Sequence, residues 1–388
     1  MKKQLSNKPQ LLTLTSLRFF ASLAVVTLHT VPDWLHLEYL ALPYFLRTYI
    51  ESSYISLPFF YVLSGFVLYY NYDKIDFSEP KNRRFFWIKR FARLAPVFYL
   101  SLPLGAYLLY CNKIKQVGAV YSLVGSLKNL LINAVFLGAW IPESLNLNFP
   151  SWSNSAEMFY YFLFPFLVPM VCRFSKTSAA WGLFLSFAFG AMIQCLGVWM
   201  FPDISRWPKE LVHVPMETVN FFRLNPLAHL NEFLFGLCLS RLFSFFPEGN
   251  AHFRRNELWF VCSLVFILFS LPLLTFLPYL MLISFFLLPW IAFVIWFGAR
   301  PRSGAGAWLE KPFFLLLGEA SYALYILHIP LKSMFTLVTG HWFPDFPQKY
   351  LIIPFLLLAP GFACLVHLYF ENPARKAWTR FLEKTLNH

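Results

Sequence analysis

Charged residues are scarce in this chain. Asp, Glu, Lys and Arg make up only 13% of its 388 residues, whereas soluble globular chains contain about one-quarter. Hydrophobic residues make up 58%, and the mean hydropathy is +0.55. This composition excludes an ordinary soluble domain. Because several windows exceed about 18 mostly apolar residues, enough to cross about 30 Å of hydrocarbon, we predict an all-α polytopic membrane protein.

Acidic residues and closely spaced cysteines are also few. The 19 Asp and Glu stand against 32 Lys and Arg, giving a formal net charge of +13. Membrane topology accounts for this excess, so we expect no nucleic-acid partner. The six cysteines show no C-x-x-C spacing and are typical of small core residues, so we predict neither a disulfide frame nor a metal site.

Repeats, linkers and low-complexity segments are absent from the sequence as well. We therefore expect a single transmembrane domain over residues 1–388, with a motif-bearing core at about 11–375 and a basic cytoplasmic tail at 376–388. The absence of an internal repeat also speaks against many transporter folds, which are built from repeated halves.

Eleven apolar segments are present, near 11–31, 53–72, 94–111, 121–140, 156–172, 179–200, 225–246, 257–276, 279–298, 313–337 and 350–370. If all eleven crossed, the basic start and the basic tail would lie on opposite sides, although Lys and Arg prefer the cytoplasmic side. If 121–140 does not cross, 22 Lys and Arg lie inside and nine outside, with Arg18 in the membrane. We therefore predict about ten transmembrane helices, cytoplasmic termini and a re-entrant or interfacial segment near 121–140.

Two ionisable residues, Arg18 and His29, lie within the first apolar run. Charged groups at bilayer depth are costly and usually face a protein interior or a watery cavity. Eleven residues are about three helical turns, so both side chains leave nearly the same helix face, about 16 Å apart along the axis. A neutral imidazole can take a proton from a hydroxyl. The alternative is a histidine that only forms hydrogen bonds at the membrane interface.

Arg90 and Arg93 form an Arg-x-x-Arg pair at the inner end of the third span. Residues at i and i+3 share a helix face, and guanidinium groups bind phosphate in bidentate fashion. A phosphorylated cytosolic donor, such as an acyl-coenzyme A, would suit this pair. The alternative is a pair of ordinary cytoplasmic anchors that contact anionic lipid.

Glu157 follows Ser151-Trp152-Ser153 at the outer start of the fifth span. Asn154 with Glu157 fits a capping-box variant, in which the carboxylate only satisfies backbone donors. Topology also places Glu157 at the level of His29, where a carboxylate could orient an imidazole and stabilise its protonated form.

Further polar residues lie inside apolar spans. Ser321, Tyr325 and His328 form a stripe at i, i+4 and i+7, and Glu232 lies in the seventh span. Polar groups in lipid must find partners, so helix packing explains these residues as well as function does. Ser64-Gly65 in the second span is a small pair suited to close helix approach.

These pieces, in this order, resemble the acyltransferase-3 family of integral membrane acyltransferases. The matching motifs cover residues 14 to 375 and are Leu14-Thr15-Ser16-Leu17-Arg18 with His29, Phe59-Phe60-x-x-Leu63-Ser64-Gly65-Phe66, Arg90-x-x-Arg93-Leu94-x-Pro96, Ser151-Trp152-Ser153-x-x-x-Glu157, Glu232-Phe233-x-x-Gly236, Ser321-Tyr322-x-x-Tyr325-x-x-His328-x-Pro330 and Glu371-x-Pro373 with Arg375.

The resemblance implies transfer of an acyl group, most often acetyl, from cytosolic acyl-coenzyme A to a hydroxyl of an envelope carbohydrate. Acceptors of this kind include lipopolysaccharide O-antigen, capsule, exopolysaccharide and lipid-linked glycans. The donor, acetyl-coenzyme A, would be a substrate and no cofactor would stay bound. The resemblance further implies a stand-alone member in the bacterial cytoplasmic (inner) membrane, in contact with membrane lipid. The oligomeric state is not indicated.

The family's histidine, arginine and Arg-x-x-Arg map onto His29, Arg18, Arg90 and Arg93. We expect His29 to deprotonate the acceptor hydroxyl, with Glu157 orienting the imidazole. Arg18 would stabilise either the oxyanion or the donor's pantetheine arm. Direct transfer and a two-step route through an acyl-histidine both stay open. The rival interpretation is a transporter or flippase without covalent chemistry.

Overall fold

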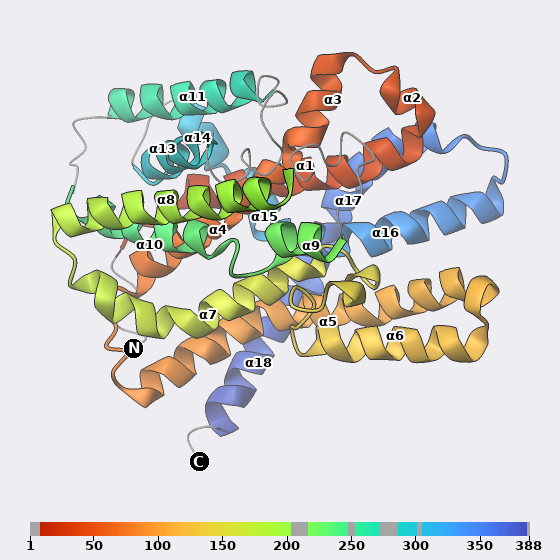
Figure 1. The fold of residues 1–388 in the computed structure, drawn as a ribbon, viewed down its shortest axis with the longest axis horizontal. Helices are drawn as coiled ribbons and strands as arrows, with labels where there is room; N and C mark the ends of the chain where they lie inside the picture. Colours follow the sequence, from red (N-terminus) through yellow and green to blue (C-terminus); the bar gives the residue numbers. More distant parts are fainter. Residues whose placement is uncertain (1–7, 203–215, 247–252, 272–285, 301–304, 386–388) are drawn as a thin grey trace.

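The computed structural model describes residues 8–202, 216–246, 253–271, 286–300 and 305–385. Within these ranges the chain is helical and contains no strand (Figure 1). The helices are, in chain order, α1 (Leu12–Leu35), α2 (Leu37–Leu40), α3 (Tyr44–Glu51), α4 (Ser56–Tyr72), α5 (Pro80–Val117), α6 (Ala119–Ala134), α7 (Ser151–Cys172), α8 (Lys176–Met200), α9 (Met216–Leu224), α10 (Leu230–Ser244), α11 (Phe253–Ser270), α13 (Leu288–Gly298), α14 (Ala305–Leu309), α15 (Pro312–Glu319), α16 (Ser321–Trp342), α17 (Ile352–Val366) and α18 (Asn372–Thr385).

Seven stretches of the described chain are long and apolar enough to cross a membrane. Four of them are the complete helices α1, α7, α8 and α16. The other three are Pro80–Ile114, which is most of α5, Tyr44–Tyr72, which contains α3 and α4, and Gln348–Leu382, which contains α17 and most of α18. The prediction of an all-α polytopic membrane protein is confirmed. The other three predicted spans coincide with α10, α11 and α13, which are shorter or more charged. Residues 279–285 of the predicted span 279–298 lie outside the described residues, and the count of ten stays a prediction.

The predicted span 313–337 consists of two helices rather than one. α15 ends at Glu319, and α16 begins at Ser321. A Cβ at Gly318 would collide with the backbone carbonyl of Thr15, so α15 packs closely on α1 just before the break. Hydropathy does not detect such a break because a long window averages the two polar residues at it, Glu319 and Ser321, with the apolar runs on either side.

α4 and α10 pack backbone against backbone at two glycines. A Cβ at Gly65 would collide with the carbonyl oxygen of Phe233, and one at Gly236 would collide with that of Val62. Small residues permit such close approach between membrane helices. The close helix approach predicted for the Ser64-Gly65 pair is made by Gly65, whereas Ser64 lines the cavity described below.

α1 and α16 run parallel and share a polar seam. Its side-chain contacts join Ser22 to Ser321, His29 to His328 and Asp33 to Lys332. The two partners of each pair are 299 residues apart in the chain. This constant offset means that the two helices stay in register over three turns.

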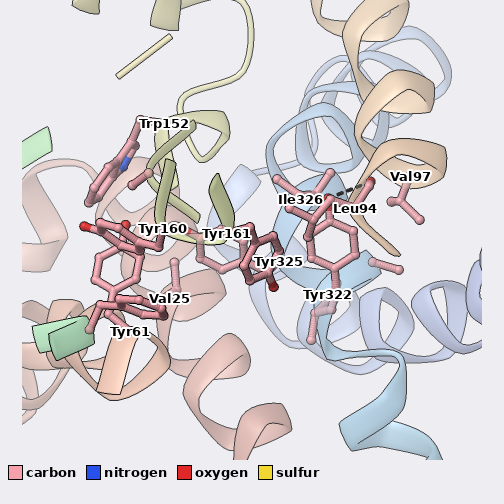
Figure 2. Close-up of a cluster of buried hydrophobic side chains, with 14 of the residues drawn as sticks. Val25, Tyr61, Leu94, Val97, Trp152, Tyr160, Tyr161, Tyr322, Tyr325 and Ile326 are labelled. Atoms are coloured by element: carbon pink, nitrogen blue, oxygen red, sulfur yellow. Dashed lines mark hydrogen bonds between the residues drawn. The ribbon is translucent and has the colours of Figure 1, made fainter. Parts of the chain in front are cut away.

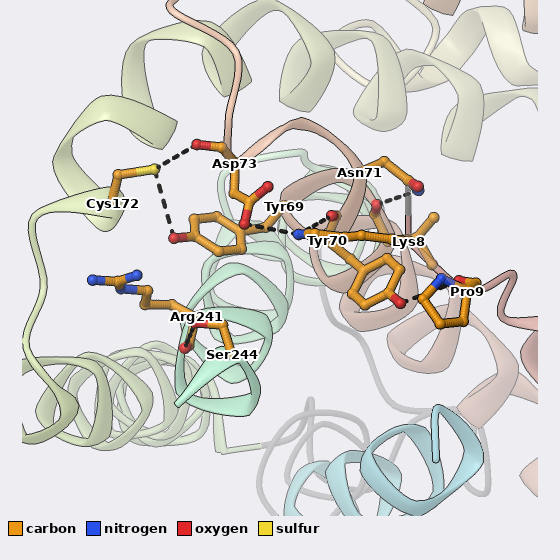
Figure 3. Close-up of polar contacts among 10 residues, drawn as sticks. Lys8, Pro9, Tyr69, Tyr70, Asn71, Asp73, Cys172, Arg241 and Ser244 are labelled. Carbon is orange, nitrogen blue, oxygen red and sulfur yellow. Dashed lines mark hydrogen bonds and ion pairs between the residues drawn. The ribbon is translucent and has the colours of Figure 1, made fainter. Parts of the chain in front are cut away.

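The start of α1 and the ends of α4, α7 and α10 lie together (Figure 3). Lys8 pairs with Asp73 at 2.8 Å, and the Cys172 thiol lies 3.3 Å from the Asp73 carbonyl oxygen. Arg241 donates to the carbonyl of Phe174 at 2.9 Å. In the predicted ten-span topology, the start of α1 and the ends of α4, α7 and α10 all lie on the cytoplasmic side. Their closeness in the structure agrees with that prediction.

α6 turns back along the second half of α5 and forms a hairpin with it (Figure 1). The turn is made at Gly118, whose φ of 78° favours glycine. The Tyr99 hydroxyl donates to the carbonyl of Ala134 at 2.9 Å, near the end of α6. α6 has 16 residues and is not among the seven span-length stretches. The interfacial or re-entrant placement of 121–140 stays a prediction.

Candidate active site

A cavity of about 730 Å³ lies between six helices, α1, α4, α5, α7, α15 and α16. Its charged lining consists of four cationic and two carboxylate side chains, which are Lys8, Arg18, Arg90, Arg93, Glu157 and Glu319. Four of them, Arg18, Arg90, Arg93 and Glu157, come from the membrane-length helices α1, α5 and α7 and face this interior space, where charged groups are tolerated at membrane depth. Lys8 precedes α1, and Glu319 is largely exposed at the end of α15. The cavity therefore carries excess positive charge inside the bundle.

Arg18 and Arg93 reach this cavity from α1 and α5. Neither forms an ion pair or a side-chain hydrogen bond with the described part of the chain. Glu157 is among the charged groups close to Arg18 and accepts a hydrogen bond from the Tyr161 hydroxyl. Two guanidinium groups thus face an internal space with few protein anions, and an anionic ligand would complete their environment.

Arg90 is held differently from Arg93. Its guanidinium lies 5.2 to 5.8 Å from the ring centroids of Tyr72, Phe86 and Tyr161. Its Nη2 donates to the Tyr72 hydroxyl at 2.8 Å, and its buried Nε has no hydrogen-bond partner in the described chain. The aromatic cage fixes the direction of this guanidinium, since cations are attracted to ring faces.

Tyrosines from α4, α7 and α16 gather in one buried cluster (Figure 2), and four of them, Tyr61, Tyr161, Tyr322 and Tyr325, line the cavity. The Tyr322 hydroxyl donates to the Leu94 carbonyl at 2.9 Å and accepts from the Asn154 amide at 3.1 Å. Tyr322 and Tyr325, both predicted as polar core residues, line the cavity.

Ser321, the first residue of the predicted polar stripe, also lines the cavity. Its hydroxyl donates to the Gly318 carbonyl at 2.7 Å, which is a local bond across the break between α15 and α16. Its own carbonyl accepts from the Ser22 hydroxyl at 3.0 Å. Both bonds tie the start of α16 to its neighbours, which supports the packing interpretation of this residue.

His29 and His328 face each other outside the cavity lining. Their Nδ1 and Nε2 atoms are 2.9 Å apart, and the two rings are almost parallel, at 2°. The ring of Phe149 meets the His29 ring edge-on at 5.9 Å. Tyr325 connects the two regions, because it lines the cavity and its ring centroid lies 6.1 Å from that of His328.

The predicted contact between Glu157 and His29 is not formed. The structure pairs His29 with His328 and places Glu157 in the cavity with Arg18. α7 begins with six residues, Ser151–Ala156, that are all buried in the protein. Glu157, which follows them, faces the cavity with Arg18 rather than the contact between α1 and α16 that holds His29.

Glu232 does not line the cavity. It pairs with His229, whose Nδ1 lies 3.1 Å from its carboxylate, and both side chains are buried. The other nitrogen of His229 lies 2.8 Å from the Arg223 carbonyl oxygen. The pair is enclosed by protein partners on both sides, which matches the structural interpretation of this residue.

A second histidine–carboxylate pair was not predicted from the sequence. His367 lies 3.0 Å from Glu371 and 3.5 Å from the cavity residue Glu319. His367 and Glu371 are each only 3% exposed and belong to a π-helical turn, a feature often found at functional sites. The i, i+4 spacing of two ionisable residues in an apolar span was the available signal.

Comparison with known proteins gives a consistent result. A family model described as an acyltransferase domain matches residues 12–373. The acyltransferase MdmB of Streptomyces mycarofaciens is 25% identical over 237 residues, covering 59% of this chain and 56% of that protein. The O-acetyltransferase OatA of Staphylococcus aureus is 21% identical over 401 residues, covering 94% and 57%.

A shorter match is found in protein 2 of the picA locus of Rhizobium radiobacter. It is 42% identical over 60 residues, covering 16% of this chain and 31% of that protein. The chain therefore spans little more than half the length of MdmB and OatA, and less of the third relative. No solved structure matches it.

Proposed function

The chain belongs to the family of membrane acyltransferases described by the acyltransferase domain, and from this premise we propose its donor, acceptor and catalytic base. The donor is an acyl-coenzyme A, most often acetyl-coenzyme A, bound from the cytoplasm. The acceptor is a hydroxyl of an envelope carbohydrate or lipid-linked glycan. The name of OatA specifies O-acetyl transfer for that relative, which supports an oxygen acceptor here.

The observation that carries the proposal is two guanidinium groups in the cavity that form no ion pair or side-chain hydrogen bond with the described residues. Arg18 and Arg93 face a space of about 730 Å³ in which cationic side chains outnumber carboxylates. Coenzyme A carries phosphates at one end and a neutral thioester arm at the other. We assign the phosphates to Arg93 and the caged Arg90, since arginine binds phosphate in a fixed planar geometry. Arg18 is then available to the thioester end.

The orientation of the cavity supports a donor from the cytoplasmic side. Lys8, Tyr70 and Asn71 line it, and they lie just before α1 and at the end of α4, where Asn71 is exposed. These helix ends lie on the side that the charge distribution assigns to the cytoplasm. We therefore place both termini there, in a bacterial inner membrane.

His29 is proposed as the general base. Its Nε2 takes the proton of the acceptor hydroxyl while the hydroxyl oxygen attacks the thioester carbonyl carbon. The tetrahedral intermediate collapses by breaking the carbon–sulfur bond, and the protonated imidazole returns its proton to the leaving thiolate. The products are the O-acyl glycan and coenzyme A, so no other reactant is required.

The thioester arm of acyl-coenzyme A must extend from the cavity at Arg18 to His29. Arg18 lies in the cavity, and His29 is eleven residues further along α1, about 16 Å along the axis. Tyr325 lines the cavity, and its ring centroid lies 6.1 Å from that of His328. We propose that the thioester arm passes Tyr325 to reach His29.

The donor and the reaction are tested with purified protein in lipid vesicles. Acetyl-coenzyme A binding is measured by calorimetry, and transfer is measured as labelled acetyl on added glycan or lipid-linked glycan. We expect saturable binding and label in ester linkage to the glycan. Absence of both acyl-coenzyme A binding and transfer would contradict the proposal. Label trapped on the protein without acceptor would select the acyl-histidine route over direct transfer.

A further inference from the structure

We infer that His328 is a positioning residue, which holds the neutral His29 ring in its Nδ1–H form and so leaves Nε2 free to act as the base. The inference rests on the proposed function of His29 and adds to it the residue that selects its reactive nitrogen. It starts from one geometric fact. His29 Nδ1 and His328 Nε2 are 2.9 Å apart in rings that differ by only 2° in orientation.

The direction of the hydrogen bond between His29 and His328 follows from the partner of the other nitrogen of His328. His328 Nδ1 lies 2.6 Å from the backbone carbonyl oxygen of Tyr325. A carbonyl oxygen only accepts, so His328 Nδ1 must carry a proton. In a neutral imidazole the other nitrogen is then an acceptor. His328 Nε2 therefore accepts, and His29 Nδ1 donates to it.

The consequence for His29 is a single tautomer. With the proton on Nδ1, Nε2 carries the lone pair. Nε2 has no hydrogen-bond partner among the described residues, and His29 keeps an intermediate exposure, whereas His328 is only 1% exposed. The half-buried His29 ring thus presents its basic nitrogen, and the fully buried His328 ring serves as the hydrogen-bond acceptor behind it.

The surrounding contacts hold both rings in place. One turn beyond His29, Lys332 of α16 joins the two helices. It donates to the His29 carbonyl at 2.5 Å and pairs with Asp33 of α1. Two turns before His29, the Ser22 hydroxyl donates to the Ser321 carbonyl at 3.0 Å. Because the seam is fixed on both sides, a rotation of either histidine ring would break the 2.9 Å contact without forming another.

His328 accepts the Nδ1–H hydrogen bond of the catalytic histidine, as a carboxylate does in serine-hydrolase triads, but His328 is a neutral group. In those triads the acid holds the imidazole in the correct tautomer and stabilises its cation. Here the Tyr325 carbonyl orients His328, and His328 orients His29. When His29 Nε2 takes the acceptor's proton, Nδ1 still donates to His328, so no second proton has to move.

The tautomer is measured directly by nitrogen NMR on protein labelled with ¹⁵N in its histidine rings, in detergent or nanodiscs. The His29 signals are identified by their loss in His29→Ala. We expect a proton on Nδ1, none on Nε2, and a coupling across the hydrogen bond between His29 Nδ1 and His328 Nε2. A proton on His29 Nε2 in the neutral ring would overturn the inference.

Kinetics provide the second readout. His328→Leu removes the nitrogen that accepts the hydrogen bond from His29. We expect kcat to fall at least about tenfold with little change in KM for acyl-coenzyme A, because the substitution disturbs the base but not the cavity that binds acyl-coenzyme A. His328→Gln offers an amide oxygen near the position of Nε2 and is expected to recover part of kcat. His341→Leu, an exposed histidine on the same helix, is the control and should behave as wild type.

These measurements separate the inference from the function on which it rests. If wild-type protein transfers no acyl group but His29 shows the Nδ1–H form and the coupling, the proposed function fails and the tautomer assignment stands. If wild type transfers and folded His328→Leu keeps full kcat, His328 is not a positioning residue, although the acyltransferase proposal stands.

Discussion

Arg90 and Tyr72 are joined by a hydrogen bond of 2.8 Å between Nη2 and the phenolic oxygen, and the tyrosine ring also lies 5.2 Å from the guanidinium. One tyrosine thus fixes both the plane and the position of a buried cation. Arg93, one turn further along α5, has no such partner among the described residues and faces the cavity. Arg90 is thus held in place by the protein, whereas the protein leaves all the hydrogen-bond donors of Arg93 to a ligand.

We therefore predict that Arg93→Ala raises the KM for acyl-coenzyme A about tenfold or more, because a charged hydrogen bond to the donor is worth about 1.5–3 kcal/mol. Steady-state kinetics with varied donor provide the measurement. Arg84→Ala, an exposed arginine on the same helix, is the control and should leave KM unchanged. Equal effects of the two substitutions would show that only the overall charge of this surface matters.

Glu157 lowers the positive charge of the same cavity. Glu157→Gln keeps its size but removes the anion near Arg18, so we predict tighter binding of coenzyme A and a steeper loss of affinity with salt. Calorimetry at two salt concentrations measures this. Glu143→Gln changes the net charge equally at an exposed site and should have no such effect. Weaker binding in Glu157→Gln would mean that the carboxylate holds Arg18 or Tyr161 in its binding position.

The glycine contacts between α4 and α10 make a prediction about stability. Gly65→Ala places a methyl group against the backbone carbonyl of Phe233, and the two helices must separate to accept it. Such overpacking costs about 1–3 kcal/mol, so we expect a lower Tm in detergent. Gly361→Ala on α17 meets no atom within 4 Å and is the control. An unchanged Tm for Gly65→Ala would show that the helix contact adapts freely.

The predicted topology is tested at the connection after α6. A reporter inserted near residue 145 should lie outside the cytoplasm if 121–140 does not cross, and reporters at the two termini should lie inside. α6 has only 16 residues and folds back along α5, which agrees with this expectation. A cytoplasmic reporter at 145 would show that the segment crosses and would change the side assigned to α7.

Much of the fold could be predicted because hydropathy and charge report directly on bilayer crossing. The run containing Arg18 and His29 is a single helix, and Arg18, Arg90 and Arg93 face an interior space, as expected for ionisable groups at membrane depth. The break between α15 and α16 was missed, since hydropathy averages Glu319 and Ser321 at the break with the longer apolar runs around them.

The pairing of side chains between helices could not be predicted. Spacing within one helix shows which residues share a face, but not the register between α1 and α16 that brings His29 to His328. Glu157 illustrates the same limit. Its place near the start of α7 indicated an outer position near His29, but the carboxylate faces the cavity with Arg18 instead.

The central claim, acyl transfer that depends on His29, is tested most directly by the O-acyl content of the envelope polysaccharides. NMR would compare a deletion strain with the same strain carrying wild-type protein or His29→Ala, with membrane insertion of both checked. We predict that wild type restores the acyl signal and that His29→Ala, which loses a base worth about 10²–10⁴ in rate, does not. Full restoration by His29→Ala, or none by wild type, would contradict the account.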